Sequence, residues 1–191
     1  MLKIINKQIK NMEAFQNFKL KQSENIYWDL LKRNNTNYYI AMSDKGLISL
    51  SLGGNNFEEF TSSIKKVVND PQFVHDSSKL SDAKAQLTDY FEGSRKTFDL
   101  PLDLRGTEFQ KSVWNSLLSI PFGETRSYLE IAKDIGNEKA VRAVGGACGA
   151  NHVPIIVPCH RVLGKSGTMT GFSAFGGVST KEALLKHEGY F

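Results

Sequence analysis

The side chains best suited to chemistry in this sequence are a cysteine followed directly by a histidine and an arginine, Cys159-His160-Arg161. The residues just before them, 153–158, are apolar and include two prolines that restrict the backbone. This pattern predicts a rigid and largely buried thiol. Burial alone raises the pKa of a thiol and makes it inert, so a nucleophilic Cys159 needs a proton acceptor and a nearby positive charge. His160 and Arg161 have the chemistry for these two roles.

Consecutive side chains rarely point the same way, which argues against a direct contact between Cys159 and His160. A water-bridged relay is easier to build, with His160 oriented by a carboxylate as in other sets of nucleophile, base and orienting group. Glu188, which follows the last expected helix, is a candidate for that carboxylate. Local spacing does not prove this assignment.

Three other interpretations of Cys159 are open at this point. It can be an inert core cysteine, which is the usual role of a buried one. It can bind zinc with Cys148, His152 and His160, although neighbouring Cys and His residues seldom converge on one metal and no Cys-x-x-Cys pair is present. A cysteine hydrolase would need a distant histidine, and no local signature supports one.

The segment 139–150 combines helical spacing with many small residues, including Gly145 next to Gly146. Each interior glycine costs a helix about 1 kcal/mol relative to alanine. Tight packing against another helix is one explanation, and close approach to a narrow DNA groove is the other. In the second case Arg142 would be the long side chain able to probe the base stack; otherwise it is a solvated surface arginine.

The elements that must position these groups are helices in the second half of the chain. Two capping-box patterns open the first two helices, Asn137 caps a third at about 138–149, and a final helix ends at His187. The second and third helices, joined at Gly136, form a helix-turn-helix. The two capping boxes are Thr107–Gln110 and Ser127–Glu130, and Ser179–Glu182 is the expected start of the final helix.

The first hundred residues predict a mixed α/β unit. Strands are expected at 38–42 and 46–52 with a hairpin turn between them, and helices at 57–68 and from Ser81 to Gly93. The alternating segment 98–104 predicts a strand, in which Pro101 suits an edge or linking position. The domain boundary is placed near this segment.

Composition restricts the class of protein. The chain has 191 residues and a net charge of +4, which permits a polyanion partner without indicating one. Its apolar runs are too short to span a bilayer, and its first residues lack the apolar core of a secretion signal. Two cysteines are too few for a disulfide framework. We therefore expect a cytoplasmic protein without a membrane partner.

These motifs resemble those of the methylated-DNA–protein-cysteine methyltransferases, the O6-alkylguanine-DNA alkyltransferase family. The resemblance is strongest over 106–189 and weak over the first 80 residues. It depends on Pro158–Val162, preceded by 142–147 and Asn151 and followed by 187–189.

The resemblance implies an α+β fold. A ribonuclease-H-like α/β domain would span 1–103, and a winged-helix-like domain with the helix-turn-helix, which binds DNA and accepts the alkyl group, would span 104–191. The implied function is DNA repair by direct damage reversal. An alkyl (methyl) group would move irreversibly from O6-alkylguanine in double-stranded DNA to Cys159, once per molecule, with O4-alkylthymine as a further candidate substrate. No cofactor and no metal are implied, and we expect a monomer.

The same resemblance implies roles for individual residues. His160 and Glu188 would form the water-mediated relay that keeps Cys159 a thiolate, while Asn151 would brace the turn before it. Arg142 would intercalate and replace the flipped nucleotide.

Tyr128 would help to rotate the nucleotide and donate a proton to the departing guanine. Further residues would line the base pocket or lie near the DNA backbone. The pocket residues are Pro154, Val162, Phe172 and Ser173, and the backbone contacts are Asn137, Gln110 and Lys165.

Some positions depart from the family pattern. His152 stands where a proline is usual, Phe172 replaces the commoner tyrosine, and 171–177 is about two residues longer than in many relatives. The N-terminal half has no cysteine and only His75, so the structural zinc site of some relatives should be absent. The departures at 152, 172 and 171–177 concern the pocket and not the acceptor.

The alternative function, from a different class, is a non-catalytic protein that binds alkyl lesions or regulates transcription through the helix-turn-helix. Non-catalytic members of the family replace the cysteine, so the presence of Cys159 favours the enzyme. A metal-binding structural module fails on ligand count.

Overall fold

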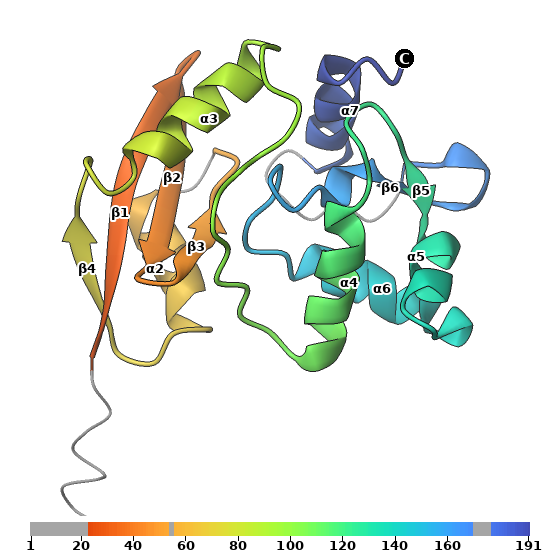
Figure 1. Ribbon diagram of the computed structural model, residues 1–191, viewed down its shortest axis with the longest axis horizontal. Coiled ribbons are helices and arrows are strands. Elements are labelled where there is room, and N and C mark those ends of the chain that lie inside the picture. The colour runs from red at the N-terminus through yellow and green to blue at the C-terminus, as the bar shows by residue number, and fades with distance from the viewer. Residues whose placement is uncertain (1–22, 54–55, 170–176) are drawn as a thin grey trace, which may run out of the picture.

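A four-stranded sheet organises the first of two domains that lie side by side (Figure 1). The computed structural model describes residues 23–53, 56–169 and 177–191. The strand order is β3-β2-β1-β4, with antiparallel neighbours except for β4, which runs parallel to β1. The strands are β1 (Glu24–Arg33), β2 (Thr36–Ser43), β3 (Gly46–Leu50) and β4 (Pro71–His75).

Two helices, α2 (Phe57–Lys65) and α3 (Ser81–Phe91), cover opposite faces of this sheet. Successive side chains of a strand point to opposite faces. Ile40 of β2 accordingly belongs to the core cluster on the α3 side, whereas its neighbour Ala41 belongs to the cluster on the α2 side. The alternation of apolar residues in β2 and β3 therefore builds a core on each face.

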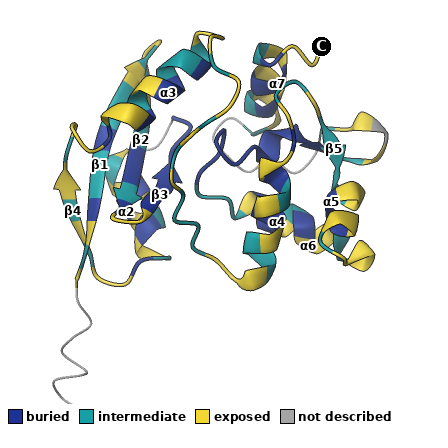
Figure 2. Cartoon of the chain, in the orientation of Figure 1, coloured by how far each residue is buried: buried dark blue, intermediate teal, exposed yellow. Residues whose placement is uncertain are grey.

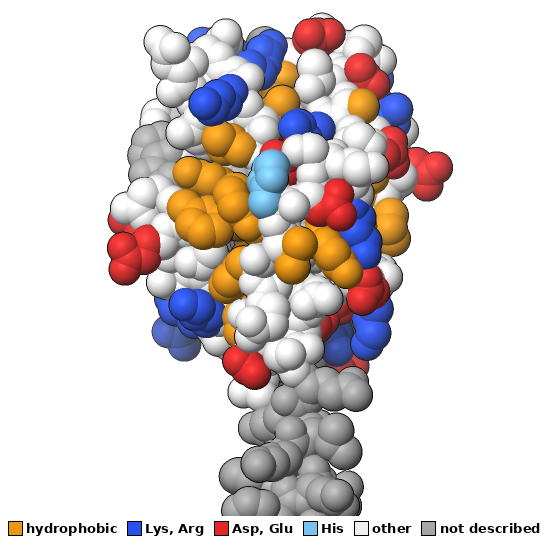
Figure 3. Space-filling model, turned by 90° about the vertical axis from the view of Figure 1, so that its left-hand side faces the viewer, with side chains coloured by type: hydrophobic (Ala, Val, Ile, Leu, Met, Phe, Trp, Pro, Cys, Tyr) orange, Lys and Arg blue, Asp and Glu red, His pale blue; other side chains and the backbone are white. Residues whose placement is uncertain are grey.

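The predicted hairpin and the helices of this domain are present, but two strands were not expected. In β1 the buried side chains are only Ile26 and Asp29, and charged residues hide the alternation. The strand β4 is a short edge strand. At that edge, apolar side chains reach the surface around a histidine (Figure 3), where the ring of Trp28 contacts those of Phe57 and His75.

The strand predicted at 98–104 is wrong. The segment runs along β3 and makes only an isolated bridge between Leu47 and Leu102. Leu47 donates its N–H to the carbonyl oxygen of Pro101, and Asp103 donates to that of Leu47. Pro101 lacks the N–H that a continuous ladder needs. A Cβ at Gly46 would lie 2.4 Å from the Pro101 oxygen, so this close approach requires glycine.

The second domain consists of helices around a two-stranded parallel pair, β5 and β6. Capping boxes open α4 and α5 as predicted, with Thr107 paired to Gln110 and Ser127 to Glu130. The bounds are α4 (Glu108–Leu118), β5 (Arg126–Ser127), α5 (Tyr128–Asp134), the 3-10 helix η1 (Glu138–Ala140), α6 (Val141–Gly149), the 3-10 helix η2 (Cys159–Arg161), β6 (Val162–Leu163), the 3-10 helix η3 (Lys165–Gly167) and α7 (Gly177–His187).

Three predicted helix starts need correction. Asn137 makes no side-chain cap, because a 3-10 turn precedes α6. Ser179 lies inside α7, which begins at Gly177, and Ser81 lies inside α3, whose N-cap position is Leu80. A helix is present in each of these regions as predicted, but it begins at a different residue from the one expected.

One core cluster joins the two domains. It includes Leu87 and Tyr90 of α3 together with Val113 and Trp114 of α4 and the residues before Cys159. Figure 2 shows the buried residues gathered in the sheet and in the segment enclosed by α4 and α7. The expected α+β class, with a sheet domain followed by a helical domain, is confirmed. Within the described ranges, no helix has both the length and the apolar character needed to cross a bilayer.

Candidate active site

The segment that links α6 to Cys159 is held by the side chain of Asn151. Asn151 Nδ2 donates to the carbonyl oxygen of Val157 at 2.8 Å and contacts Cys159 Sγ at 3.3 Å, and its Oδ1 accepts from the N–H of Val153 at 2.9 Å. One amide therefore fixes both ends of the turn and reaches the sulfur.

This segment also contains an unusual backbone conformation. Ile155 has φ of +73°, a region that β-branched residues strongly avoid. The side chain is buried, and the bond from Val157 N–H to the Val153 oxygen, at 2.9 Å, closes the turn around it. Backbone strain of this kind persists only where the surrounding structure enforces it, and it clusters at functional sites.

The N-terminal domain supports the same segment. Leu50, at the end of β3, donates its N–H to the carbonyl oxygen of His152 at 2.8 Å. The His152 side chain is half-buried, and its pKa is lowered by burial and by the charge of Lys66. A residue that departs from the family pattern is thus placed at the contact between the domains.

A fully buried pair, His160 and Glu188, lies next to the cysteine. His160 Nε2 is 2.8 Å from Glu188 Oε1. A carboxylate can only accept, so Nε2 carries the proton and Nδ1 is left as an acceptor. Burial lowers the pKa of His160, so the ring is neutral at pH 7. Of the buried side-chain nitrogen and oxygen atoms in the described residues, only His160 Nδ1 has no hydrogen-bond partner.

Glu188 is anchored from several directions. Arg161 donates through Nε and Nη2 at 2.8 and 2.9 Å, Tyr90 donates its hydroxyl at 2.8 Å, and the N–H of Gly123 donates at 3.3 Å. Burial raises the pKa of Glu188, but the bonds from His160 and Arg161 outweigh it and hold the pKa far below the ordinary value. The carboxylate therefore remains charged and immobile.

Arg161 does not supply the positive charge that was expected from it at the thiol. Its guanidinium is taken up by Glu188 and by the carbonyl oxygen of Ile120, which accepts from Nη1 at 2.6 Å. Its task in the structure is to position the carboxylate of the relay.

The cation near the sulfur is instead Lys181 of α7, which sequence reasoning missed. Its side chain is fully buried, and Nζ donates to the carbonyl oxygen of Val162. Burial lowers the pKa of Lys181, and the two cysteines oppose this shift. The only signal in the sequence was a lysine at a position where the helix faces the core, and that face is known only from the fold.

Cys159 itself is 6% exposed, and burial raises its pKa. The Asn151 hydrogen bond and the charge of Lys181 both lower it. Cys148, on α6, is also buried, and burial raises its pKa to about 12. Cys159 is the cysteine that receives the Asn151 hydrogen bond and directly precedes His160, so the two thiols differ in environment.

Tyr128 opens α5 and faces the same region. Burial raises its pKa to about 12, and the nearby Cys148 and Cys159 add to this shift. Lys181 Nζ lies 5.8 Å from the centre of the Tyr128 ring. The phenol is therefore protonated at neutral pH.

The residues expected at DNA are exposed on neighbouring elements. Arg142 lies on α6, Asn137 directly before η1, and Lys165 on η3, and all three are exposed. Gln110 is half-buried, and its side chain accepts from the N–H of Thr107 in the capping box. The side-chain oxygen of Gln110 is therefore occupied by the capping box at the start of α4.

The expected pocket residues are described only in part. Pro154 and Val162 are both buried, and they follow Asn151 and Cys159 in the sequence by three residues each. Phe172 and Ser173 lie outside the described residues. Within the part of the chain that the structure describes, no three His, Cys, Asp or Glu side chains are placed to hold a metal ion.

Comparison with known proteins gives two family-model matches. The model described as the ribonuclease-like domain of 6-O-methylguanine DNA methyltransferase matches residues 26–104, and the model of its DNA-binding domain matches residues 108–190.

Similar proteins carry related names. The inducible methylated-DNA–protein-cysteine methyltransferase of Bacillus subtilis is 45% identical over 85% of this chain and 90% of its own length. A crystal structure of Mycobacterium tuberculosis O6-methylguanine methyltransferase has 41% identity and a TM-score of 0.72 over 85% of this chain and 92% of its own. A Mycobacterium tuberculosis OGT structure in complex with DNA has 40% identity and a TM-score of 0.68 over 86% and 92%.

Proposed function

Since this chain belongs to the methylated-DNA–protein-cysteine methyltransferase family, we propose that Cys159 is the residue that accepts the alkyl group. The chain is a DNA-repair enzyme that transfers an alkyl group from methylated DNA to its own cysteine. The observation that carries the assignment to Cys159 is the buried His160–Glu188 pair, which leaves Nδ1 as an acceptor without a partner on the residue that directly follows Cys159.

The relay begins with the thiol proton. A water molecule carries it from Cys159 to His160 Nδ1, and the fixed charge of Glu188 stabilises the imidazolium that results. Asn151 and Lys181 stabilise the thiolate, because one donates a hydrogen bond to the sulfur and the other places a positive charge near it. Burial alone would leave this thiol protonated and inert.

The sulfur then attacks the alkyl carbon. A sulfur–carbon bond forms, the bond between that carbon and guanine O6 breaks, and the electron pair stays with guanine. Tyr128, whose phenol is protonated at neutral pH, donates the proton that neutralises the departing base. The thioether has no leaving group that water can easily replace, so each molecule reacts once.

The base must leave the duplex to reach a buried sulfur, which costs a few kcal/mol. The small-residue face of α6 suits close approach to the minor groove, and the exposed Arg142 can fill the space of the extruded nucleotide. Asn137 and Lys165 would contact the backbone, whereas the capping bond of Gln110 limits its part. Pro154, Val162, Phe172 and Ser173 would line the base pocket.

The proposal includes further points. The enzyme would act as a monomer on double-stranded DNA. Two free cysteines, Cys148 and Cys159, suit a reducing cytoplasm. The domains would divide as 1–103 and 104–191, since Asp103 still bonds to Leu47 and Thr107 already caps α4.

Mass spectrometry tests the acceptor. After incubation with duplex DNA that contains O6-methylguanine, we expect one added methyl group on the peptide with Cys159. Cys159→Ala should abolish transfer and keep DNA binding, whereas Cys148→Ala should retain transfer. Methylation confined to Cys148, with Cys159 shown to be intact, would overturn the assignment.

Arg142→Ala tests the intercalation role. We expect a loss of roughly tenfold or more in the rate with duplex DNA, since the unstacking would lack compensation. The rate with free O6-methylguanine should stay nearly unchanged. Equal losses on both substrates would contradict this role.

A further inference from the structure

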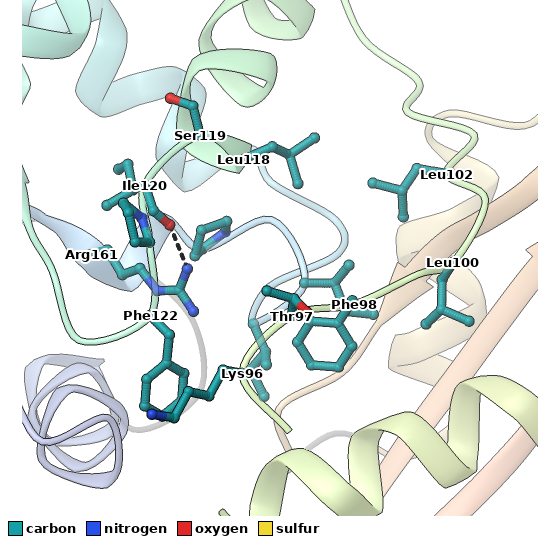
Figure 4. A pocket seen from close by; sticks show the side chains of 14 residues that line it. Lys96, Thr97, Phe98, Leu100, Leu102, Leu118, Ser119, Ile120, Phe122 and Arg161 are labelled. Atoms are coloured by element: carbon teal, nitrogen blue, oxygen red, sulfur yellow. Dashed lines mark hydrogen bonds between the residues drawn. The ribbon is translucent and has the colours of Figure 1, made fainter. Parts of the chain in front are cut away.

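A cavity of about 190 Å³ lies beside the active-site segment, between the domain-connecting residues 96–102 and the end of α4 (Figure 4). Residues 155, 156 and 158 form part of its wall. None of the proposed base-pocket or relay residues Tyr128, Asn151, Pro154, Cys159 and Val162 lines it. The cavity is therefore distinct from the described part of the site where guanine would bind.

Most of the side chains that line the cavity are apolar, two carry hydroxyl groups, and the charged ones are cations. Phe98, Leu100, Leu102 and Leu118 extend into the space in Figure 4. The lining includes Lys96 and Arg161, and none of the described residues that line it is acidic. A charge pattern of this kind favours an anion with an apolar body over a neutral or cationic ligand.

The two cations approach the same aromatic ring. Lys96 Nζ lies 5.6 Å from the centre of the Phe122 ring, and the guanidinium carbon of Arg161 lies 5.9 Å from it. Lys96 is exposed at the rim, whereas Arg161 is 6% exposed. A ligand that enters past Lys96 would meet the buried guanidinium of Arg161, whose charge Glu188 already balances.

Arg161 has donors left for such a ligand. A guanidinium carries five N–H bonds. Glu188 accepts from Nε and Nη2, and the Ile120 oxygen accepts from Nη1. Within the described ranges the two remaining N–H bonds of this buried side chain have no partner. Arginine pairs well with carboxylates through such donors.

We propose that this cavity binds a small carboxylate with a compact apolar body, of about the size of phenylacetate. An apolar cavity of about 150 Å³ can hold benzene, so about 190 Å³ leaves room for a ring and a short acidic substituent. The ring would lie among the leucines and Phe98, and the carboxylate would face Lys96 and Arg161. The bound ligand would touch Pro158, directly before Cys159.

Titration of the full chain with phenylacetate, followed by ¹H–¹⁵N NMR, tests the proposal. We expect saturable shifts at residues 96–102, 118–122 and 155–158, with a dissociation constant on the order of 1 mM for a ligand this small. Phenylacetamide, which keeps the shape without the charge, should bind about fivefold more weakly or worse, and acetate should not saturate.

Variants locate the site. Lys96→Gln should weaken phenylacetate about fivefold, while Lys65→Gln, an exposed lysine on α2, should leave binding unchanged. Leu118→Trp should fill the cavity and abolish the shifts, and retained methyl transfer would show that this variant folds. Equal affinity for the amide, equal affinity of the Lys96 variant, or no saturable shift at the lining residues would overturn the proposal.

Discussion

At the residue scale, the reactivity of Cys159 depends on a balance between burial and two opposing groups. Burial raises the pKa of the thiol, and the Asn151 amide and the Lys181 ammonium lower it. Lys181 is itself fully buried, and its pKa is lowered by that burial. A buried ammonium gains most when an anion forms next to it, because charges interact strongly where water is excluded. Lys181 therefore favours the sulfur anion over the neutral thiol.

Lys181→Met keeps the length of the side chain and removes this charge. We expect the rate constant of Cys159 with iodoacetamide to rise throughout pH 6.5–9.5 in the natural protein, because the pKa of the thiol is raised. In the variant the whole profile should move to higher pH, with about a tenfold slower reaction at pH 7.5, which corresponds to one pKa unit. Lys186→Met, an exposed change on the same helix, serves as the control; superimposable profiles for both variants would exclude this role.

At the element scale, α6 is built for an external contact. Among the described residues, a Cβ added at Gly146 would meet nothing within 4 Å, and one at Gly145 would meet only Tyr128 Cε1, at 3.9 Å. Internal packing thus does not require glycine at either position, in contrast to Gly46 against Pro101. The helix carries the propensity cost of two glycines without a packing reason in the part of the chain that the structure describes. A close external partner such as DNA explains it better than helix packing.

Gly146→Ala separates stability from binding. The free energy of unfolding should rise by about 0.5–1 kcal/mol, since alanine is the better helix former. Affinity for duplex DNA should fall severalfold, because the methyl group occupies the contact face. Urea unfolding and fluorescence anisotropy measure the two effects. Ser62→Ala, at an exposed position of α2, should change DNA affinity by no measurable amount; unchanged affinity in Gly146→Ala as well would argue against DNA contact here.

At the scale of the whole molecule, the relay depends on both domains. Tyr90 of α3 reaches Glu188 across 98 positions of the sequence, and His187 Nε2 lies 2.6 Å from the carbonyl oxygen of Tyr90. Together with the bond from Leu50 to His152, these contacts tie the sheet domain to the active-site segment. The N-terminal domain therefore helps to hold the catalytic geometry in place.

Two histidines, the buried His160 and the half-buried His152, predict how stability depends on pH. Burial lowers the pKa of His160 and of His152 in the folded protein, so the unfolded chain binds more protons as the pH falls below about 6.5. Stability should be complete above that value and decline towards pH 5.5. Below about 4.5, protonation of Glu188 in the unfolded chain adds a further loss, because its pKa is lowered in the fold.

Urea unfolding at pH 7.5, 6.5 and 5.5 measures this decline. His160→Asn should make the slope shallower, since it removes a buried histidine whose pKa is lowered in the fold. Stability that is flat across this range in the natural protein would contradict a neutral, buried His160.

The sequence by itself determined the features that depend on near neighbours in the chain. The capping boxes at Thr107 and Ser127 satisfy helix N–H groups three residues away, so their spacing is sufficient to predict them. The hairpin at 43–46 and the segment around Cys159 are local in the same sense. The resemblance to the family also rested on short motifs in order along the chain.

Only the tertiary structure decided which distant groups meet. The strands β1 and β4 exist because they pair with each other and with β2, and their own residues carry little alternation. Lys181 belongs to the site, and Arg161 binds Glu188 where a contact with the thiol was expected, because of where α7 packs. The packing of the whole folded chain decides which of these charged groups are buried and which of them pair.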